Sequence, residues 1–122
     1  MSIIRVDNFG PSAGGTTYSA RGIAKAWVNF NGTGTVAVRD SENVSSLTDI
    51  STGRYAANLS SSMTDANYSI QVCSSATVDN NGYDMTHNPT MTSSFCPARH
   101  FESGGTATDT DLVTVAIHGD LA

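Results

Sequence analysis

The sequence predicts an all-β protein: an antiparallel β-sandwich or jelly-roll-like domain of seven or eight short strands. Several short segments alternate apolar and polar residues with a period of two, as the two faces of a strand require. Of the 122 residues, 51 are Ser, Thr, Asn or Gly, which suits short strands joined by tight turns. Frequent turn signals between the alternating segments are typical of a sandwich or jelly-roll-like domain.

The chain is expected to divide into an N-terminal arm and linker over residues 1–20 and a sandwich domain over residues 21–122. The arm begins with the apolar run IIRV, and a segment rich in Gly, Pro and Ser follows it and interrupts regular structure. It is either an edge strand of the domain or an arm that docks onto a larger assembly by strand addition. The docking interpretation uses the apolar side chains of Ile3, Ile4, Val6 and Phe9.

The strongest local prediction is a hairpin near the start of the domain. In Gly22–Phe30, Val28 and Phe30 lie on one face of a strand, and Ile23 and Trp27 lie on the other. Both faces carry large apolar side chains, so we expect Ile23 and Trp27 to be covered by another sheet or another subunit. The letters NGTG then supply a turn, and TVAVR returns as the second strand.

Further alternating segments continue the domain to its end. They cover residues 43–50, 54–60, 67–74 and 112–118, with another strand over residues 93–101 that is broken by Pro97. Residues 74–92 show no sustained period and predict a long loop with a brief strand inside it. The residues expected to pack in the core or between subunits are Ile23, Trp27, Phe30, Tyr55, Leu59 and Tyr68.

The long loop is the candidate contact surface. It combines an aromatic residue, amides and a histidine, the composition of an adaptable binding loop. The candidate contact residues are Tyr83, Met85, His87 and Asn88. An ordinary surface loop is the alternative interpretation.

Composition excludes several classes of partner and favours self-association. Only 23 residues are Leu, Ile, Val or Phe, so the core is thin, and burial against identical neighbours would supplement it. One lysine and five arginines form no basic stripe, so neither nucleic acid nor an anionic membrane surface is an expected partner. No apolar stretch is long enough for membrane insertion, and the first residues lack a secretion signal.

No catalytic residue, metal site or cofactor is expected. The sequence contains no nucleophile elbow, phosphate-binding glycine loop or zinc-protease motif. Asp109 and Asp111 are a weak candidate for a cation site, because nothing nearby completes the set of ligands. His87, Cys96 and His100 are a weak candidate for a zinc site, because their spacings match no familiar zinc motif. The cysteines at 73 and 96 are either two buried thiols or one bridge between neighbouring strands, and the geometry decides between these.

The segment KAWVNFNGTGTVAVR, residues 25–39, resembles a small domain common at the C-terminal ends of phage tail fibres, including those of marine and cyanobacterial phages. The similarity extends over roughly residues 21–119 and is weakest over 74–111. The further matching segments are Asn43–Ser46 with Thr48–Asp49, Gly53–Tyr55 with Asn58, Met63 with Asp65–Tyr68, and Leu112–Ile117.

This resemblance implies a virion protein that is assembled in the cytoplasm of a host bacterium and is usually trimeric. A small tail fibre or tail-tip protein that contributes to host-surface attachment is the expected function. Its partners would be other tail or capsid proteins and a glycan or protein of the host surface. A short arm without a long shaft leaves a head fibre or capsid decoration protein as an alternative, and a carbohydrate-binding module of non-viral origin as another. The resemblance implies no catalytic residues.

Overall fold

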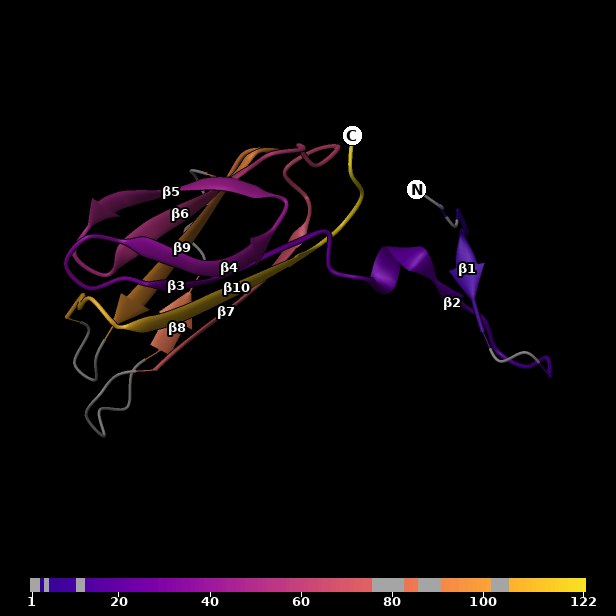
Figure 1. Cartoon of the computed structure of the whole chain (residues 1–122), viewed down its shortest axis with the longest axis horizontal. Coiled ribbons are helices and arrows are strands. Elements are labelled where there is room, and N and C mark those ends of the chain that lie inside the picture. The colour runs from indigo at the N-terminus through magenta and orange to yellow at the C-terminus, as the bar shows by residue number, and fades with distance from the viewer. Residues whose placement is uncertain (1–2, 4, 11–12, 76–82, 86–90, 102–105) are drawn as a thin grey trace.

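The computed structural model describes residues 3, 5–10, 13–75, 83–85, 91–101 and 106–122. These residues form ten β-strands and one short 3-10 helix (Figure 1). The elements are β1 (Asn8–Phe9), β2 (Tyr18–Ser19), η1 (Ala20–Gly22), β3 (Ala26–Asn31), β4 (Ala37–Glu42), β5 (Val44–Ser51), β6 (Arg54–Leu59), β7 (Ser69–Ser75), β8 (Tyr83–Met85), β9 (Phe95–Phe101) and β10 (Leu112–His118). In the described part of the chain, no helix has the length and apolarity to span a membrane.

Eight strands form two four-stranded antiparallel sheets that pack on one another (Figure 1). The first sheet has the strand order β4-β3-β10-β7, and the second has the order β5-β6-β9-β8. Every pairing within the two sheets is antiparallel. The architecture is therefore an antiparallel β-sandwich of eight strands, which confirms the fold class expected from the sequence.

The predicted hairpin is formed by β3 and β4. Its turn is fixed by Asn31, whose side-chain Oδ1 accepts hydrogen bonds from the backbone N and the hydroxyl of Thr33, at 3.1 and 2.8 Å. Such an Asx turn redirects the chain immediately after a strand. Gly34 follows with a positive φ of 63°, a conformation that glycine adopts without a steric cost.

The core lies between the sheets and is built from the inward-facing residues of the alternating strands. Four of the predicted packing residues, Phe30, Tyr55, Leu59 and Tyr68, are buried there. The rings of Phe30 and Tyr55 meet edge to face, with centroids 5.2 Å apart and planes at 75°. The other buried apolar residues of this cluster are Ala26, Val28, Ala57, Met63, Cys96, Ala98, Val113, Val115 and Ile117.

Two predicted packing residues lie outside this core. Trp27 is 37% exposed, because alternation along β3 turns it away from the second sheet. Ile23 is 52% exposed and lies before β3, directly after the 3-10 helix η1, so the predicted strand begins at Ala26 and not at Gly22. The interpretation of these residues as covered by another sheet is therefore wrong. Their burial against another subunit stays a prediction.

Pro97 does not break its strand, contrary to the expectation from sequence. β9 runs from Phe95 to Phe101, and Pro97 pairs with Ala56 of β6. On its other side, the described residues of β8 pair with Arg99–Phe101 of β9. A proline is tolerated in a strand where its missing N–H is not needed by a neighbour, and the described part of β8 does not reach Pro97.

The N-terminal arm forms its own small hairpin, which projects from one end of the sandwich (Figure 1). β1 pairs only with β2 among the described strands, and the rings of Phe9 and Tyr18 lie 6.2 Å apart. Ile3, Val6 and Phe9 are all exposed, whereas Ile4 lies outside the described residues. The arm is therefore not an edge strand of either large sheet, and its docking role stays a prediction.

Deleting residues 1–15 is expected to leave the sandwich folded. The deleted strand β1 is paired with β2 and with neither large sheet, so its removal costs no ladder of the sandwich. Thermal unfolding followed by far-ultraviolet circular dichroism should give a midpoint within about 3 °C of the full chain, a shift worth under 1 kcal/mol at this size. A loss of cooperative unfolding would instead make the arm part of the core.

Candidate functional site

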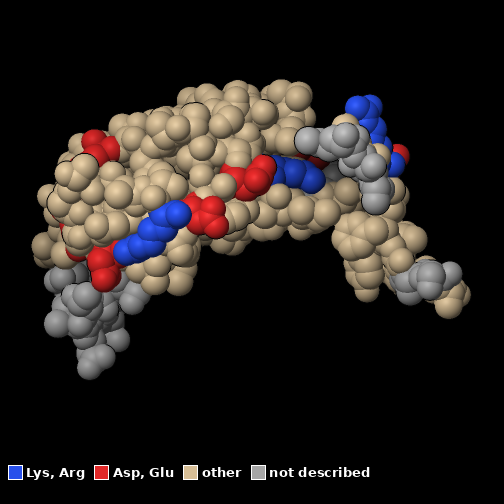
Figure 2. Space-filling view, in the orientation of Figure 1, with Lys and Arg blue, Asp and Glu red and all other residues tan. Residues whose placement is uncertain are grey.

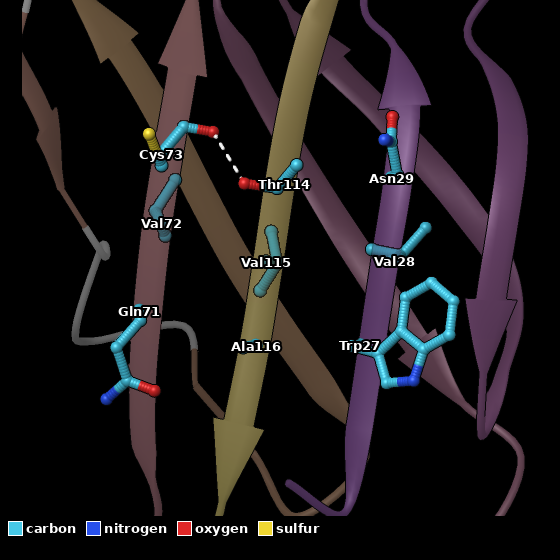
Figure 3. A pocket seen from close by; sticks show the side chains of 9 residues that line it. All are labelled: Trp27, Val28, Asn29, Gln71, Val72, Cys73, Thr114, Val115 and Ala116. Atoms are coloured by element: carbon cyan, nitrogen blue, oxygen red, sulfur yellow. Dashed lines mark hydrogen bonds between the residues drawn. The ribbon is translucent and has the colours of Figure 1, made fainter.

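A groove of about 340 Å³ lies on the outer face of the first sheet, away from the core. It crosses three neighbouring strands, β3, β10 and β7 (Figure 3). We call it the Trp27 groove. Its lining residues are Trp27, Val28 and Asn29 from β3, Gln71, Val72 and Cys73 from β7, and Thr114, Val115 and Ala116 from β10.

Strand register explains why the sheet is hollowed at this place. Ala116 of β10 pairs with Trp27 on one side and with Gln71 on the other. The three residues therefore form a row across the sheet, with a single methyl group between two long side chains. The next row repeats the arrangement with Thr114 between Asn29 and Cys73. Small residues on the central strand thus form the floor, and the flanking strands form the walls (Figure 3).

Hydrogen bonds hold the polar wall of the groove in place. The side-chain oxygen of Gln71 lies 2.8 Å from Nδ1 of His118, and its amide nitrogen donates to the hydroxyl of Ser69 at 2.6 Å. The hydroxyl of Thr114 donates to the carbonyl oxygen of Cys73 at 3.2 Å (Figure 3). A ligand would therefore meet side chains that are already oriented, which lowers the entropic cost of binding.

The groove offers side chains that suit non-covalent recognition. None of its nine lining residues carries a carboxylate, an ammonium or a guanidinium group. Trp27 offers a large, partly exposed aromatic surface, and aromatic residues of this kind act as anchors in binding sites. The amides of Asn29 and Gln71 add donors and acceptors beside it. This palette suits stacking on an apolar ligand face combined with hydrogen bonding at its rim.

The titratable groups with altered pKa values lie in the core and serve the fold. Burial raises the pKa of Tyr55, and the hydrogen bond from its hydroxyl to Asp109 raises it further. Burial also raises the pKa of Tyr68, as does its hydrogen bond with Cys96. Burial raises the pKa of the Cys96 thiol in turn. These groups lie between the sheets and do not line the Trp27 groove.

Two of the candidate cation ligands, Asp109 and His100, make hydrogen bonds within the fold. Asp109 accepts hydrogen bonds from the backbone N of Gly53 at 2.7 Å and from the hydroxyl of Tyr55 at 3.0 Å. Nδ1 of His100 lies 2.5 Å from the hydroxyl of Ser74. The described residues hold no group of three His, Cys, Asp or Glu side chains that could bind a metal ion. His87, a member of the second candidate set, lies outside the described residues.

The structure decides the state of the cysteines. Cys73 is an exposed free thiol on the outer face of β7, and Cys96 is a buried free thiol in the core. Cys73 lies on the outer face of the first sheet, whereas Cys96 belongs to β9 of the second sheet and faces the core, so no bridge joins them. The expectation that both thiols are buried is therefore wrong for Cys73.

Only part of the predicted contact loop belongs to the described residues. Tyr83 and Met85 belong to β8, whereas His87 and Asn88 lie outside the described residues, so this site stays a prediction.

Sequence reasoning found Trp27 but missed the rest of its groove. Alternation in IQVC and LVTVAIH places Gln71, Thr114 and Ala116 on an outer face, which was the available signal. The neighbourhood of β3, β10 and β7 joins segments far apart in the chain, and a single sequence does not reveal it. Comparisons with protein-family models, with curated proteins and with solved structures return no match for this chain.

Proposed function

We propose that this chain is a bacteriophage virion protein, a small tail fibre or tail-tip protein that helps the particle attach to its host. The observation that carries the proposal is the Trp27 groove, an uncharged recognition surface on a rigid sheet. The resemblance of residues 25–39 to tail-fibre domains supports it from the sequence. The protein acts by binding, without catalysis and without a cofactor.

The two exposed apolar features take separate roles in this proposal. The Trp27 groove faces the host and binds a surface glycan or protein. The arm, with Ile3, Val6 and Phe9 exposed, docks onto another protein of the tail or the capsid. A head fibre or capsid decoration protein would dock through the same arm. A place on the capsid is therefore the second candidate. Assembly takes place in the cytoplasm of the host bacterium, and the mature protein resides in the virion.

The proposal is tested on virus particles purified by density gradient from the source of this sequence. Peptides of the chain should be found by mass spectrometry in the particle band at a copy number comparable with other minor structural proteins. Antibodies against the purified chain should then label the tail in electron micrographs, or the head if the second candidate holds. Abundance in the lysate with absence from the particle band would contradict a virion function.

A carbohydrate-binding module is favoured by one observation, the spacing of Trp27 and Gln71 across Ala116. An indole ring can stack on the apolar face of a sugar while an amide bonds its hydroxyl groups, and both are present here on a flat sheet. A carbohydrate-binding module of non-viral origin would bind the same class of ligand in the same groove. It differs from the virion protein only in its origin, and the experiment on purified particles distinguishes the two.

Trp27→Ala is expected to remove binding while the fold remains. Truncating an aromatic anchor typically costs at least about 2 kcal/mol of binding free energy, more than a tenfold loss of affinity. Because Trp27 is partly exposed, the free energy of unfolding should fall by about 1 kcal/mol or less. Retention of the fluorescently labelled chain on host cells measures the binding.

The matched control for this variant is Val38→Ala, which shortens an exposed apolar side chain of β4 outside the groove. It should bind as the unmodified chain does. Trp27 is also the only tryptophan, so its fluorescence reports ligand directly in the groove. Equal binding by the Trp27→Ala and unmodified chains would exclude the groove as the attachment site.

A further inference from the structure

Two carboxylates lie beside the Trp27 groove, on the neighbouring strand β4. Glu42 pairs with Trp27, and Asp40 pairs with Asn29. Residues directly opposite in an antiparallel pair project from the same face of the sheet. Glu42 therefore extends, by one carboxylate, the row of side chains that crosses the groove at Trp27. The outer face of the sheet thus carries acidic groups along one side of a groove whose own lining is uncharged.

The indole of Trp27 and the carboxylate of Glu42 lie next to each other. Figure 3 shows the indole on the side of β3 away from β10, and β4 is the strand that pairs with β3 on that side. Directly opposite residues have Cβ atoms about 4.5–5.5 Å apart, and Glu42 is exposed. A cation that stands over the indole is therefore also within reach of a carboxylate.

Arg39 and Lys25, the cations nearest along the chain, bind backbone oxygens and not these carboxylates. Figure 2 shows charges of both signs in a band along the sandwich. Arg39 donates to a backbone carbonyl oxygen at 3.0 Å, and Lys25 donates to another at 2.7 Å. Arg39 also lies 3.4 Å from Oδ1 of Asn29, so its charge is at the row of Asp40. Among the described residues, Glu42 forms no ion pair, which leaves its charge for a ligand.

We infer that the Trp27 groove binds a glycan whose sugar units carry free amino groups, with one ammonium group placed between the indole of Trp27 and the carboxylate of Glu42. The face of an aromatic ring attracts a cation, and a carboxylate beside it adds a charge-assisted hydrogen bond. The net charge of −5 also favours a cationic ligand over an anionic one. The inference rests on the proposed attachment function and narrows its ligand to a cationic glycan.

The rest of the groove favours a sugar over a lysine side chain. The indole and the methyl group of Ala116 offer an apolar surface for the apolar face of a sugar ring. One hydrogen of the Gln71 amide bonds to Ser69, and the amide carries a second one that a ligand hydroxyl can accept. A lysine side chain has no hydroxyl groups and no flat apolar face, so it would use only Trp27 and Glu42.

Two oligosaccharides that differ in charge test the inference. The glucosamine tetramer and the N-acetylglucosamine tetramer are titrated against the full chain at about pH 6, where such amino groups are protonated. The fluorescence of Trp27, the only tryptophan, measures binding. The glucosamine tetramer should bind about tenfold more tightly, through one cation–π contact and one exposed ion pair. This preference should shrink in ~0.5 M NaCl, because salt screens exposed charges.

Equal affinities for the two tetramers, or no binding of either, would overturn the inference. The proposed attachment function would survive both results, because retention of the chain on host cells tests that function separately.

Glu42→Gln tests the position of the ammonium group. The variant keeps the size of the side chain and removes its charge, so the two tetramers should bind within about twofold of each other. Asp49→Asn removes the same charge from an exposed position on β5, in the second sheet, and should keep the full preference. Circular dichroism checks that both variants fold. An undiminished preference in Glu42→Gln would overturn the assignment of Glu42.

A lysine peptide tests the class of ligand. N-acetylated tetralysine carries as many side-chain ammonium groups as the glucosamine tetramer carries amino groups. It should bind at least about fivefold more weakly than the glucosamine tetramer, because it lacks the apolar ring face and the hydroxyl groups. Equal or tighter binding of the peptide would overturn the assignment of the ligand to a glycan.

Discussion

Replacing Gly53 by alanine is expected to lower the free energy of unfolding by more than about 3 kcal/mol. Gly53 lies in the turn between β5 and β6 with a φ of 63°, where an L side chain alone costs roughly 1–2 kcal/mol. A Cβ atom would also lie 2.7 Å from the carbonyl oxygen of His100 and 2.8 Å from backbone atoms of Thr108. These are backbone atoms, so the clash cannot be relieved by rotating a side chain.

The clash would also disturb the contacts that anchor this turn. The N of Gly53 donates to Asp109, and its carbonyl oxygen accepts from the N of His100 at 2.8 Å. The turn therefore ties the hairpin of β5 and β6 to the chain on both sides of residues 102–105. Urea unfolding followed by circular dichroism measures the loss of stability.

Gly34→Ala is the matched control for this prediction. Gly34 has the same φ of 63°, but a Cβ atom there would meet nothing within 4 Å. Its replacement should cost only the conformational penalty, roughly 1–2 kcal/mol. Equal losses in the two variants would show that the close backbone approach at Gly53 contributes nothing.

The difference between Gly53 and Gly34 depends on contacts between distant parts of the chain, which the sequence does not predict. Alternation located the strands of the sandwich, because a side-chain period of two is a local property. It also separated the faces of β3, yet both Phe30 and Trp27 are large and apolar, and only the packing of the second sheet shows which face is the core. The approach of Gly53 to Asp109 spans 56 positions along the chain, and no local pattern encodes it.

The second large effect is a loss of stability in alkaline solution. The pKa values of Tyr55 and Tyr68 are raised in the folded protein, chiefly by burial. A group whose pKa is raised by folding contributes its full stabilisation below its unfolded pKa, about 10 for tyrosine, and loses it as the pH rises further. Each tyrosine should therefore reduce the free energy of unfolding by about 1.4 kcal/mol per pH unit above pH 10. The buried thiol of Cys96, with its raised pKa, adds to the same alkaline loss.

Tyr55→Phe separates the two parts of this effect. At neutral pH it should cost about 1–3 kcal/mol, because the hydroxyl donates to Asp109 and lies 3.0 Å from the carbonyl oxygen of Gly32. Above pH 10 the free energy of unfolding of this variant should fall less steeply with pH than that of the unmodified chain. The difference should be about 1.4 kcal/mol per pH unit, the contribution of one titrating group. Urea unfolding at intervals from pH 7 to pH 11.5 gives these slopes, and identical slopes in the two proteins would mean that deprotonation of Tyr55 is not coupled to unfolding.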